Sequence, residues 1–453
     1  MTPSPTLVHL IIEFFKKWSS MFKIALIGLL ALFLLIPLGM LDSLLDERLT
    51  RRDQAIQEIT SAWGEEQTVI GPILIVPYEY ISKVWKNEEV SGKAVQKEVL
   101  QKNIENAYFL PSQVSIQGAI KTQKLYKGIY DTAVYRGEII LEGSFDSIDL
   151  NFIKKDSVKP LWEEAVLTVA ASDLRGTTGQ LKLMLSGQEY DFYPSSKLPG
   201  YSSGVHALIK DGQRLKVKSD FRVSLDLNGS KSIYFLPIGK ETTARLNSPW
   251  PDPGFRGAFL PQQRMISKDG FDATWNVSFY GRSFSQSWAT SAETPKGNII
   301  SESLFGVEFV NLIDSYRNVE RSIKYGILFI LLIFTGFWVF EHLTQIRIHP
   351  LQYVMVGIGL CFFYLVLLSM SEFLRFGYSY LIAATVTILM MGAYCSAILK
   401  STQRGAKIGL LMGSVYTLLY FTLQLQDYSL LLGTAGLLIA LSIMMFYTRK
   451  LNN

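Results

Sequence analysis

The sequence predicts a membrane protein in two parts, a bundle of six transmembrane α-helices and a large all-β, antiparallel, sandwich-like domain outside the membrane. Several apolar segments are long enough to cross the ~30 Å hydrocarbon core and have no charged residue in their interior. Between the first and second of them, apolar and polar residues alternate strictly. The composition, 49% hydrophobic and 18% charged, averages these two kinds of sequence.

The helical part has one span before the β domain and five after it. The predicted spans are residues 21–41, 323–340, 351–371, 378–399, 408–425 and 430–447. The first has Lys16, Lys17 and Lys23 at its N-terminal end and no A-x-A-like cleavage pattern, so we interpret it as an uncleaved signal anchor. Residues 1–20 either form a short interfacial helix or extend the first span. Residues 448–453 form the C-terminal segment.

Residues 42–322 are predicted to form the β domain, entered through a charged helical stalk at residues 44–60. The clearest strands alternate apolar and polar residues at 215–227 and 271–279. Further strands are expected at residues 73–84, 107–125, 130–145, 165–171, 180–185 and 232–236. No βαβ alternation is visible, which favours one or two antiparallel sandwiches. The proline-rich segment 247–261 is expected to be a rigid loop.

Lysine and arginine in the short loops give the orientation. With the N-terminus in the cytoplasm, the cytoplasmic faces carry most of these residues: Lys16, Lys17, Lys23, Arg347, Lys400, Arg404, Lys407, Arg449 and Lys450. The short outer loops carry only Arg375. Six spans then place both termini in the cytoplasm and the β domain on the opposite side. Arginines flank the β domain as well, but long translocated domains largely escape the rule.

A candidate functional cluster lies between the second and third spans. Glu341, Gln345 and His349 are spaced i, i+4, i+8 and share a face if the helix continues. They form either a polar cluster that titrates near neutral pH or a turn in which Arg347 pairs with Glu341 and His349 caps the next helix. Glu372, at the other end of the third span, is expected to pair with Arg375.

Two further candidates concern contacts. Gly405, Gly409 and Gly413 have small-xxx-small spacing, which serves helix packing within the bundle or at a dimer interface. In the proline-rich loop, aromatic and basic residues form a candidate contact site for an envelope partner: Trp250, Phe255, Arg256 and Phe259. Aromatic residues of the β domain serve either the sandwich core or a glycan platform.

Several kinds of chemistry are disfavoured. The only cysteines, Cys361 and Cys395, lie in apolar spans, so the β domain has neither disulfides nor a cysteine zinc site. His206 is the single histidine there, so a Ser-His-Asp triad would have to use it. The absence of charged residues inside the spans disfavours proton-driven transport. We therefore predict no catalytic residue, metal or cofactor, and the net charge of +5 without a basic block predicts no nucleic-acid partner.

Several motifs resemble the CreD family of bacterial inner-membrane proteins. They are R-I-H-P-L-Q-Y at 347–353, G-P-I-L-I-V-P-Y at 71–78, D-L-R-G at 173–176 and the loop ending F-L-P at 259–261. Phe373 departs from the pattern, since a histidine is expected after Glu372. The resemblance implies an inner-membrane protein with a periplasmic domain that supports cell envelope integrity under envelope stress. It also implies an association with colicin tolerance and regulation by a two-component system, and no known enzyme activity.

The predicted function is therefore non-enzymatic. The periplasmic β domain is expected to act through contacts with an envelope protein, lipid or peptidoglycan, while the helices anchor it in the bilayer. The alternative is a transporter or channel accessory for neutral or lipid-like envelope molecules, which a polar cavity through the bundle or an apolar groove in the β domain would favour.

Overall fold

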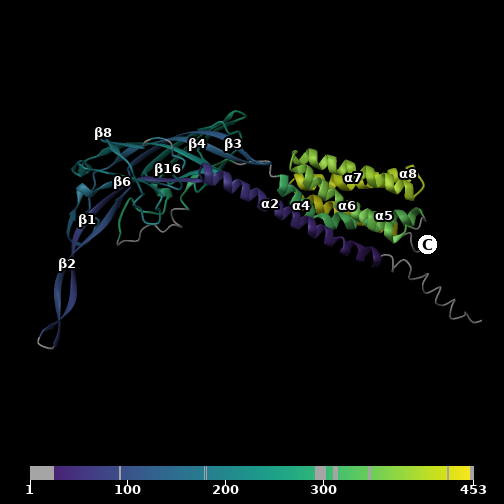
Figure 1. Ribbon diagram of the computed structural model, residues 1–453, viewed down its shortest axis with the longest axis horizontal. Helices are drawn as coiled ribbons and strands as arrows, with labels where there is room; N and C mark the ends of the chain where they lie inside the picture. Colours follow the sequence, from purple (N-terminus) through teal and green to yellow (C-terminus); the bar gives the residue numbers. More distant parts are fainter. Residues whose placement is uncertain are drawn as a thin grey trace, which may run out of the picture. The chain divides into compact units, whose positions relative to one another are not determined.

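The computed structural model describes residues 25–90, 93–177, 179, 181–290, 302–309, 315–344, 348–425 and 428–448. Two compact units make up the chain. The helical unit comprises Met1–Asp53 and Ile313–Asn453, and the β unit comprises Gln54–Leu312. Figure 1 shows helices throughout the first and strands in the second. The predicted β domain, residues 42–322, begins 12 residues before the β unit and ends 10 residues after it.

The helical unit contains the expected long apolar helices. In the described residues four of them are long and apolar enough to cross a membrane, or five if one bent pair is a single span. The helices are α2 (Leu35–Trp63), α4 (Ser315–Lys324), α5 (Gly326–Thr344), α6 (Pro350–Ser371), α7 (Phe376–Ile398), α8 (Thr402–Gln424) and α9 (Ser429–Thr448). Helix α9 occupies the sixth expected span, and its passage through the membrane stays a prediction. Residues 1–20 and the start of the first span lie outside the described residues.

Helices α4 and α5 are the bent pair, with an angle of 50° between them. Helix α4 is amphipathic: Tyr316, Val319 and Ile323 recur at helical spacing and are buried, whereas the other face carries charges. Residues 315–324 form a separate short helix, so the helix that covers most of the span expected at 323–340 begins at Gly326.

Aromatic side chains fill the contact between α6, α7 and α8. The ring of Phe363 lies 5.4 Å from Tyr380 and 4.5 Å from Tyr416, measured between centroids. The Tyr380 hydroxyl donates to the Tyr416 carbonyl at 2.7 Å. Large rings at these spacings pack the middle of the three-helix contact tightly.

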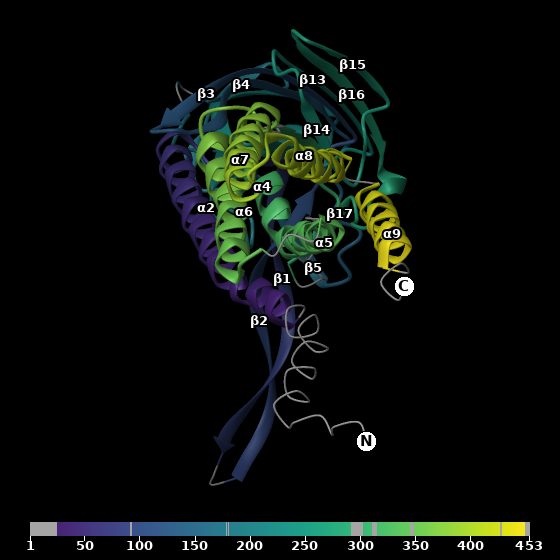
Figure 2. The same cartoon turned by 90° about the vertical axis from the view of Figure 1, so that its right-hand side faces the viewer.

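The β unit contains two mixed sheets (Figure 2). The larger, of ten described strands, runs in the order β14-β18-β12-β1-β6-β10-β9, with β2, β5 and β17 attached off this path. Its strands are β1 (Gln67–Val90), β2 (Lys93–Phe109), β5 (Asp156–Pro160), β6 (Val166–Ala171), β9 (Tyr193–Pro194), β10 (Gly204–Leu208), β12 (Ser232–Phe235), β14 (Pro253–Gly257), β17 (Ser287–Ala289) and β18 (Phe305–Phe309).

The second sheet, of eight described strands, runs in the order β15-β16-β13-β3-β4-β11-β7-β8. Its strands are β3 (Gln113–Lys127), β4 (Tyr130–Phe145), β7 (Lys182–Leu185), β8 (Gln188–Asp191), β11 (Ser219–Ser230), β13 (Glu241–Ser248), β15 (Gln263–Ser267) and β16 (Gly270–Ser278). Strand β11 buries every second residue over most of its length, as its sequence predicts. Buried side chains from both sheets form one hydrophobic core, and the finer description as a sandwich stays a prediction.

Three expectations for the β unit are wrong. The sheets are not purely antiparallel, because β1 pairs with β12 and β3 with β13 in parallel. These partners are far apart in the sequence, so no hairpin fixes their direction. The strand expected at 107–125 is two strands that belong to different sheets, separated at Leu110, Pro111 and Ser112. The proline-rich segment contains β14, which lies at a sheet edge where proline is tolerated.

Candidate functional site

The α5–α6 connection is a hydrogen-bonded turn. Glu341 is buried, and its carboxylate accepts from the Tyr353 hydroxyl at 2.9 Å and from the Ile348 N–H at 3.1 Å. His349 is the N-cap of α6: its Nδ1 accepts from the Leu351 N–H at 3.2 Å, and its own N–H donates to Gln352 Oε1 at 3.0 Å. This geometry supports the helix-capping interpretation of His349. Gln345 and Arg347 lie outside the described residues.

Glu372 lies at the other end of α6 and pairs with Arg48 of α2, not with Arg375. Arg48 Nε lies 3.5 Å from Glu372 Oε1, and the Glu372 side chain is only 11% exposed. The expected Arg375 pair is wrong, because α2 brings Arg48, which is distant in sequence, to the end of α6. The four predicted cluster residues therefore do not form one site, since α6 separates Glu372 from the Glu341 turn by roughly 33 Å.

The candidate contact loop is largely part of the core. Trp250 is 8% exposed and donates from Nε1 to the Asp252 carbonyl at 3.1 Å. The Phe255 ring stands edge-on to Phe271 and Trp275. Arg256 is exposed and pairs with Glu308 at 3.3 Å. The Phe259 carbonyl accepts from Nε1 of the buried Trp275 at 3.2 Å. That this loop contacts a partner stays a prediction. Arg256 is exposed and could take part in such a contact, whereas Trp250 is buried.

The three glycines of α8 all lie against α7. A Cβ atom added to Gly405 would lie 2.8 Å from the Gly392 carbonyl oxygen and would overlap Ser396 Oγ. At Gly409 and Gly413 the nearest atoms belong to Ile388, at 3.8 and 3.9 Å. Packing within the bundle therefore accounts for the spacing, and only Gly405 is required for close approach.

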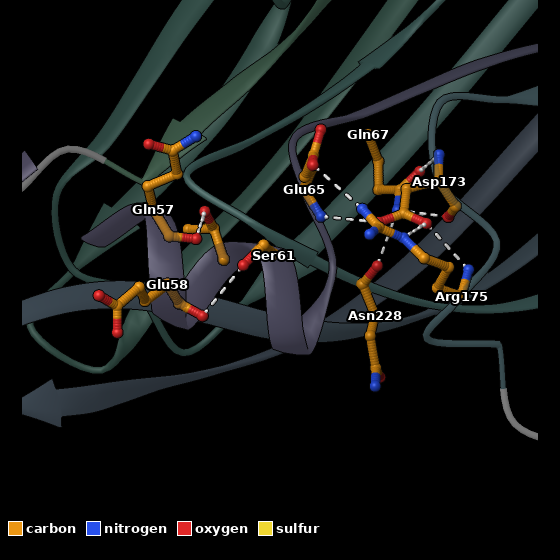
Figure 3. Close-up of polar contacts among 9 residues, drawn as sticks. Gln57, Glu58, Ser61, Glu65, Gln67, Asp173, Arg175 and Asn228 are labelled. Atoms are coloured by element: carbon orange, nitrogen blue, oxygen red, sulfur yellow. Dashed lines mark hydrogen bonds and ion pairs between the residues drawn. The ribbon is translucent and has the colours of Figure 1, made fainter. Parts of the chain in front are cut away.

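A polar network that the sequence analysis missed fixes the segment after α2 within the β unit (Figure 3). Gln67 is fully buried, and its Nε2 donates to the Asp173 carbonyl at 2.7 Å and to the Asn228 carbonyl at 2.8 Å. Its Oε1 accepts from the Asp173 N–H at 3.3 Å. One side chain at the start of β1 thus joins the turn at Asp173 to Asn228 of β11, more than 50 residues later in the sequence.

Asp173 is the charged centre of this network. Its carboxylate accepts from Arg175 through the backbone N–H, Nε and Nη2 at 2.9, 3.0 and 2.9 Å, and from the Glu65 N–H at 3.2 Å. Burial raises the pKa of Asp173, but the Arg175 and Glu65 donors outweigh it and hold that pKa below its ordinary value. Arg175 also pairs with the Glu65 carboxylate at 3.0 Å. The D-L-R-G motif at 173–176 therefore has a structural role, because its Asp173 and Arg175 bind the segment before β1.

Gly176 completes the joint. A Cβ atom at this position would lie 2.7 Å from the Trp63 carbonyl oxygen and 2.5 Å from Asn228 Cβ. Trp63, the last residue of α2, donates from Nε1 to the Tyr135 carbonyl at 3.1 Å. The joint therefore holds the end of α2 against the β unit, and we define it as Glu65, Gln67, Asp173, Arg175, Gly176 and Asn228.

A two-stranded arm projects from the β unit in both views of the fold (Figures 1 and 2). Strands β1 and β2 pair continuously out to Val90 and Lys93, whereas β5 and β17 pair only with the base of the arm. Three large apolar side chains of the arm are exposed: Trp85 by 62%, Leu100 by 64% and Ile104 by 63%. The sequence signal was the alternation of these residues with lysine and glutamate.

The exposed apolar residues share one face of the arm. Trp85 is opposite Glu98, Lys83 is opposite Leu100, and Glu79 is opposite Ile104. Successive residues of a strand point to opposite faces, so residues 79, 83 and 85 with their partners lie together. Ion pairs Lys83–Glu98 and Lys102–Glu79, at 2.7 and 3.0 Å, lie between the apolar residues. We call this surface the arm face.

The β unit also contains an apolar pocket that is partly open to solvent. Its walls come from β1, the end of β2, the turn before β10, the segment after β12, and β17. Among the described residues, no group of three or more His, Cys, Asp or Glu is placed to hold a metal ion.

The family model described as inner membrane protein CreD matches residues 19–453. This chain belongs to the CreD family. Inner membrane protein CreD of Escherichia coli K12 is 29% identical over 441 residues, which cover 97% of this chain and 93% of that protein. Membership of the CreD family, together with the apolar helices, identifies a membrane protein that crosses the bilayer several times.

Among solved structures, an M1 zinc metallopeptidase mutant from Deinococcus radiodurans bound to a Tyr-Ser-Ala substrate is similar over 37% of this chain and 39% of its own. The identity is 10% and the TM-score 0.18, so this likeness carries no argument for the CreD family.

Proposed function

We propose that this CreD-family protein supports cell envelope integrity without catalysing a reaction, through contacts that its β unit makes on the periplasmic side of the inner membrane. The envelope role is the one implied by the family resemblance. Support for it comes from the architecture, since the chain places more than half of its residues in a β unit between membrane helices.

The distribution of positive charge supports the periplasmic location. Lys400 lies between α7 and α8, and Arg404 and Lys407 lie in the first two turns of α8, whereas the short α6–α7 connection carries only Arg375. Because cytoplasmic loops are rich in lysine and arginine, the α7–α8 connection belongs in the cytoplasm. The N- and C-termini then lie in the cytoplasm and the β unit on the opposite side.

The observation that carries the proposal is the arm face. A two-stranded ribbon is marginally stable alone, and exposing a large indole and two branched aliphatic side chains on it has no advantage for the isolated chain. The edges of the arm beyond its base are also unpaired in the described residues. A projecting ribbon that exposes large apolar side chains among ion pairs on one face suits contact with an envelope protein, lipid or peptidoglycan.

In-cell crosslinking tests this proposal. A photo-crosslinking amino acid at Trp85 or Leu100 is expected to capture a discrete envelope partner, because both side chains lie on the arm face. The matched control is Met265, which is 72% exposed on β15 in the other sheet. Equal capture from all three positions, or capture of bulk lipid alone, would count against the arm face.

A complementation assay tests whether the arm face is needed for function. Trp85→Lys and Leu100→Lys place charges on the arm face and are expected to abolish rescue of detergent resistance in a strain that lacks the protein. Met265→Lys is expected to rescue fully. Membrane abundance is measured for each variant, and full rescue by the two arm variants at normal abundance contradicts the proposal.

The second candidate function is an accessory role in handling neutral or lipid-like envelope molecules. The apolar pocket of the β unit is the observation that favours it. Under this alternative, variants that fill the pocket lose rescue while arm-face variants retain it, so the same complementation assay separates the two functions.

A further inference from the structure

The segment that leads into β17 contains a buried arginine that has no acidic partner. Arg282 is 8% exposed. Its guanidinium donates from Nη1 to the Phe284 carbonyl at 2.9 Å and from Nη2 to the Ile238 carbonyl at 3.3 Å and to Gln286 Oε1. All of these acceptors are neutral. Buried charges in proteins are normally paired, because an uncompensated one is costly.

The electrostatics of Arg282 agree with this geometry. Burial lowers the pKa of Arg282 to about 10, and no described carboxylate acts in the opposite direction. Its Nε is buried and has no hydrogen-bond acceptor. A buried N–H donor without a partner costs about 1–3 kcal/mol, and more when the group is charged. An anion at Nε would remove both penalties.

The unpaired guanidinium adjoins the apolar pocket. Its carbon lies 4.2 Å from the centre of the Phe284 ring, and Phe284 forms part of the pocket wall. Ile238, whose carbonyl accepts from Arg282, lines the pocket as well. Arg282 therefore lies directly behind the pocket wall, in contact with two of the residues that form it.

The lining of the pocket favours a ligand that is mostly apolar. Aliphatic side chains line it, among them Ile70, Ile73, Leu110 and Leu236. Its mouth includes Leu198 and the next residues of the turn before β10. The indole N–H of Trp288, on the pocket wall, is buried and has no partner either. A ligand with one apolar chain and one acidic end suits the apolar walls and the two unpartnered donors buried behind them.

We propose that this pocket binds an acidic amphiphile, with its apolar chain against the β1 wall and its acid group paired with Arg282. The ligand class has two sources in a membrane, free fatty acids and anionic phospholipids. The binding site is independent of the proposed envelope role, because it rests on the pocket and not on the arm face.

Photolabelling of the purified full-length protein in phosphatidylcholine nanodiscs tests the site. The probes are palmitate with a mid-chain diazirine, the corresponding primary alcohol, and phosphatidylglycerol with the same diazirine chain. The acid is expected to label residues 198–201 or 284–288 at least tenfold more than the alcohol. Labelling by the phospholipid as well identifies bilayer lipid as the source, and labelling by palmitate alone identifies free fatty acid.

Variants of Arg282 test whether this residue causes the preference for the acid over the alcohol. Arg282→Gln is expected to reduce labelling by the acid at least tenfold, and Arg282→Lys to retain part of it. The control, Arg264→Gln, removes an exposed arginine of β15 and is expected to change nothing. Should Arg282→Gln fail to fold, Leu198→Trp fills the pocket mouth, leaves the arginine in place and is expected to abolish labelling.

Two outcomes overturn the proposal: equal labelling by acid and alcohol, or labelling by the acid that persists in a folded Arg282→Gln or Leu198→Trp variant. Failure of all probes to label the pocket also overturns it. Because binding is measured on purified protein, none of these outcomes bears on the crosslinking and rescue assays for the arm face.

Discussion

At the residue scale, the joint after α2 shows how a few side chains fix a backbone. Gln67 and Asp173 together satisfy backbone groups from the segment before β1, the 173–176 turn and the end of β11. Both are buried, so water cannot replace a partner that is removed. These residues therefore contribute more to stability than the exposed ion pairs of the β unit.

The first prediction concerns Asp173→Asn. The variant is expected to unfold with about 2 kcal/mol less free energy than the natural protein at pH 7, because a charged acceptor of four hydrogen bonds becomes neutral. Urea unfolding followed by circular dichroism measures the difference. The control, Asp226→Asn, changes an exposed carboxylate on β11 and is expected to shift the free energy by less than about 0.5 kcal/mol.

The pH dependence of the same variant has a defined sign. The pKa of Asp173 is lowered in the folded protein, so its contribution is complete above the unfolded pKa of about 3.9 and is lost as pH falls through the folded value. The stability difference between natural protein and Asp173→Asn is expected to stay constant from pH 7 to about pH 5 and to shrink at lower pH. A difference that grows on acidification would contradict this assignment.

The second prediction separates the two partners considered for Glu372. Arg48→Glu places like charges at 3.5 Å and is expected to lower thermal stability in detergent, whereas Arg375→Glu is expected to have little effect. The exchange of both charges in Arg48→Glu with Glu372→Arg is expected to recover about 0.5–1 kcal/mol. A greater loss of thermal stability from Arg375→Glu than from Arg48→Glu would instead support the pairing of Glu372 with Arg375 that the sequence predicted.

At the element scale, local sequence patterns predicted strands and helices well where one period dominates. Alternation over 271–279 predicts β16, found at Gly270–Ser278, and the apolar run at 351–371 predicts α6, found at Pro350–Ser371. Such patterns are predictive because the spacing of apolar residues along the local sequence shows which face of a helix or strand is buried. They fail at Pro111, where a short break moves the chain from one sheet to the other.

The candidate sites were harder to predict because they depend on residues distant in sequence. The joint combines Gln67 with Asp173 and Asn228, and Glu372 pairs with Arg48. No local period connects such positions, and the parallel partners of β1 and β3 could not be assigned for the same reason. Only the capping role of His349, next to Pro350, was evident from adjacent residues.

The third prediction concerns the α7–α8 contact. Gly405→Ala is expected to destabilise the helical unit by about 1–3 kcal/mol, because its methyl group would overlap Ser396 and approach the Gly392 backbone. Gly409→Ala and Gly413→Ala are matched controls on the same helix and are expected to be neutral or slightly stabilising. Heating in detergent followed by size-exclusion chromatography ranks the three variants. Equal loss at all three positions would indicate that the stripe packs against another surface.

At the scale of the whole molecule, the helical unit and the β unit have separate physical requirements. The helices satisfy their own backbone groups and need an apolar solvent, whereas the β unit has a continuous core of its own and needs water around it. The chain passes from one to the other through α2 and returns near residue 313. The side of the membrane that holds the β unit therefore decides which partners the arm face and the pocket can meet.

The fourth prediction tests that side directly. With both native cysteines replaced by serine, Tyr280→Cys, at a site 87% exposed in the β unit, is expected to react with a membrane-impermeant maleimide in cells whose outer membrane is permeabilised. Arg404→Cys, at the start of α8, is expected to react only after lysis, because the positive residues around it belong in the cytoplasm. The reverse pattern would place the β unit in the cytoplasm, where the arm face could not contact a periplasmic partner.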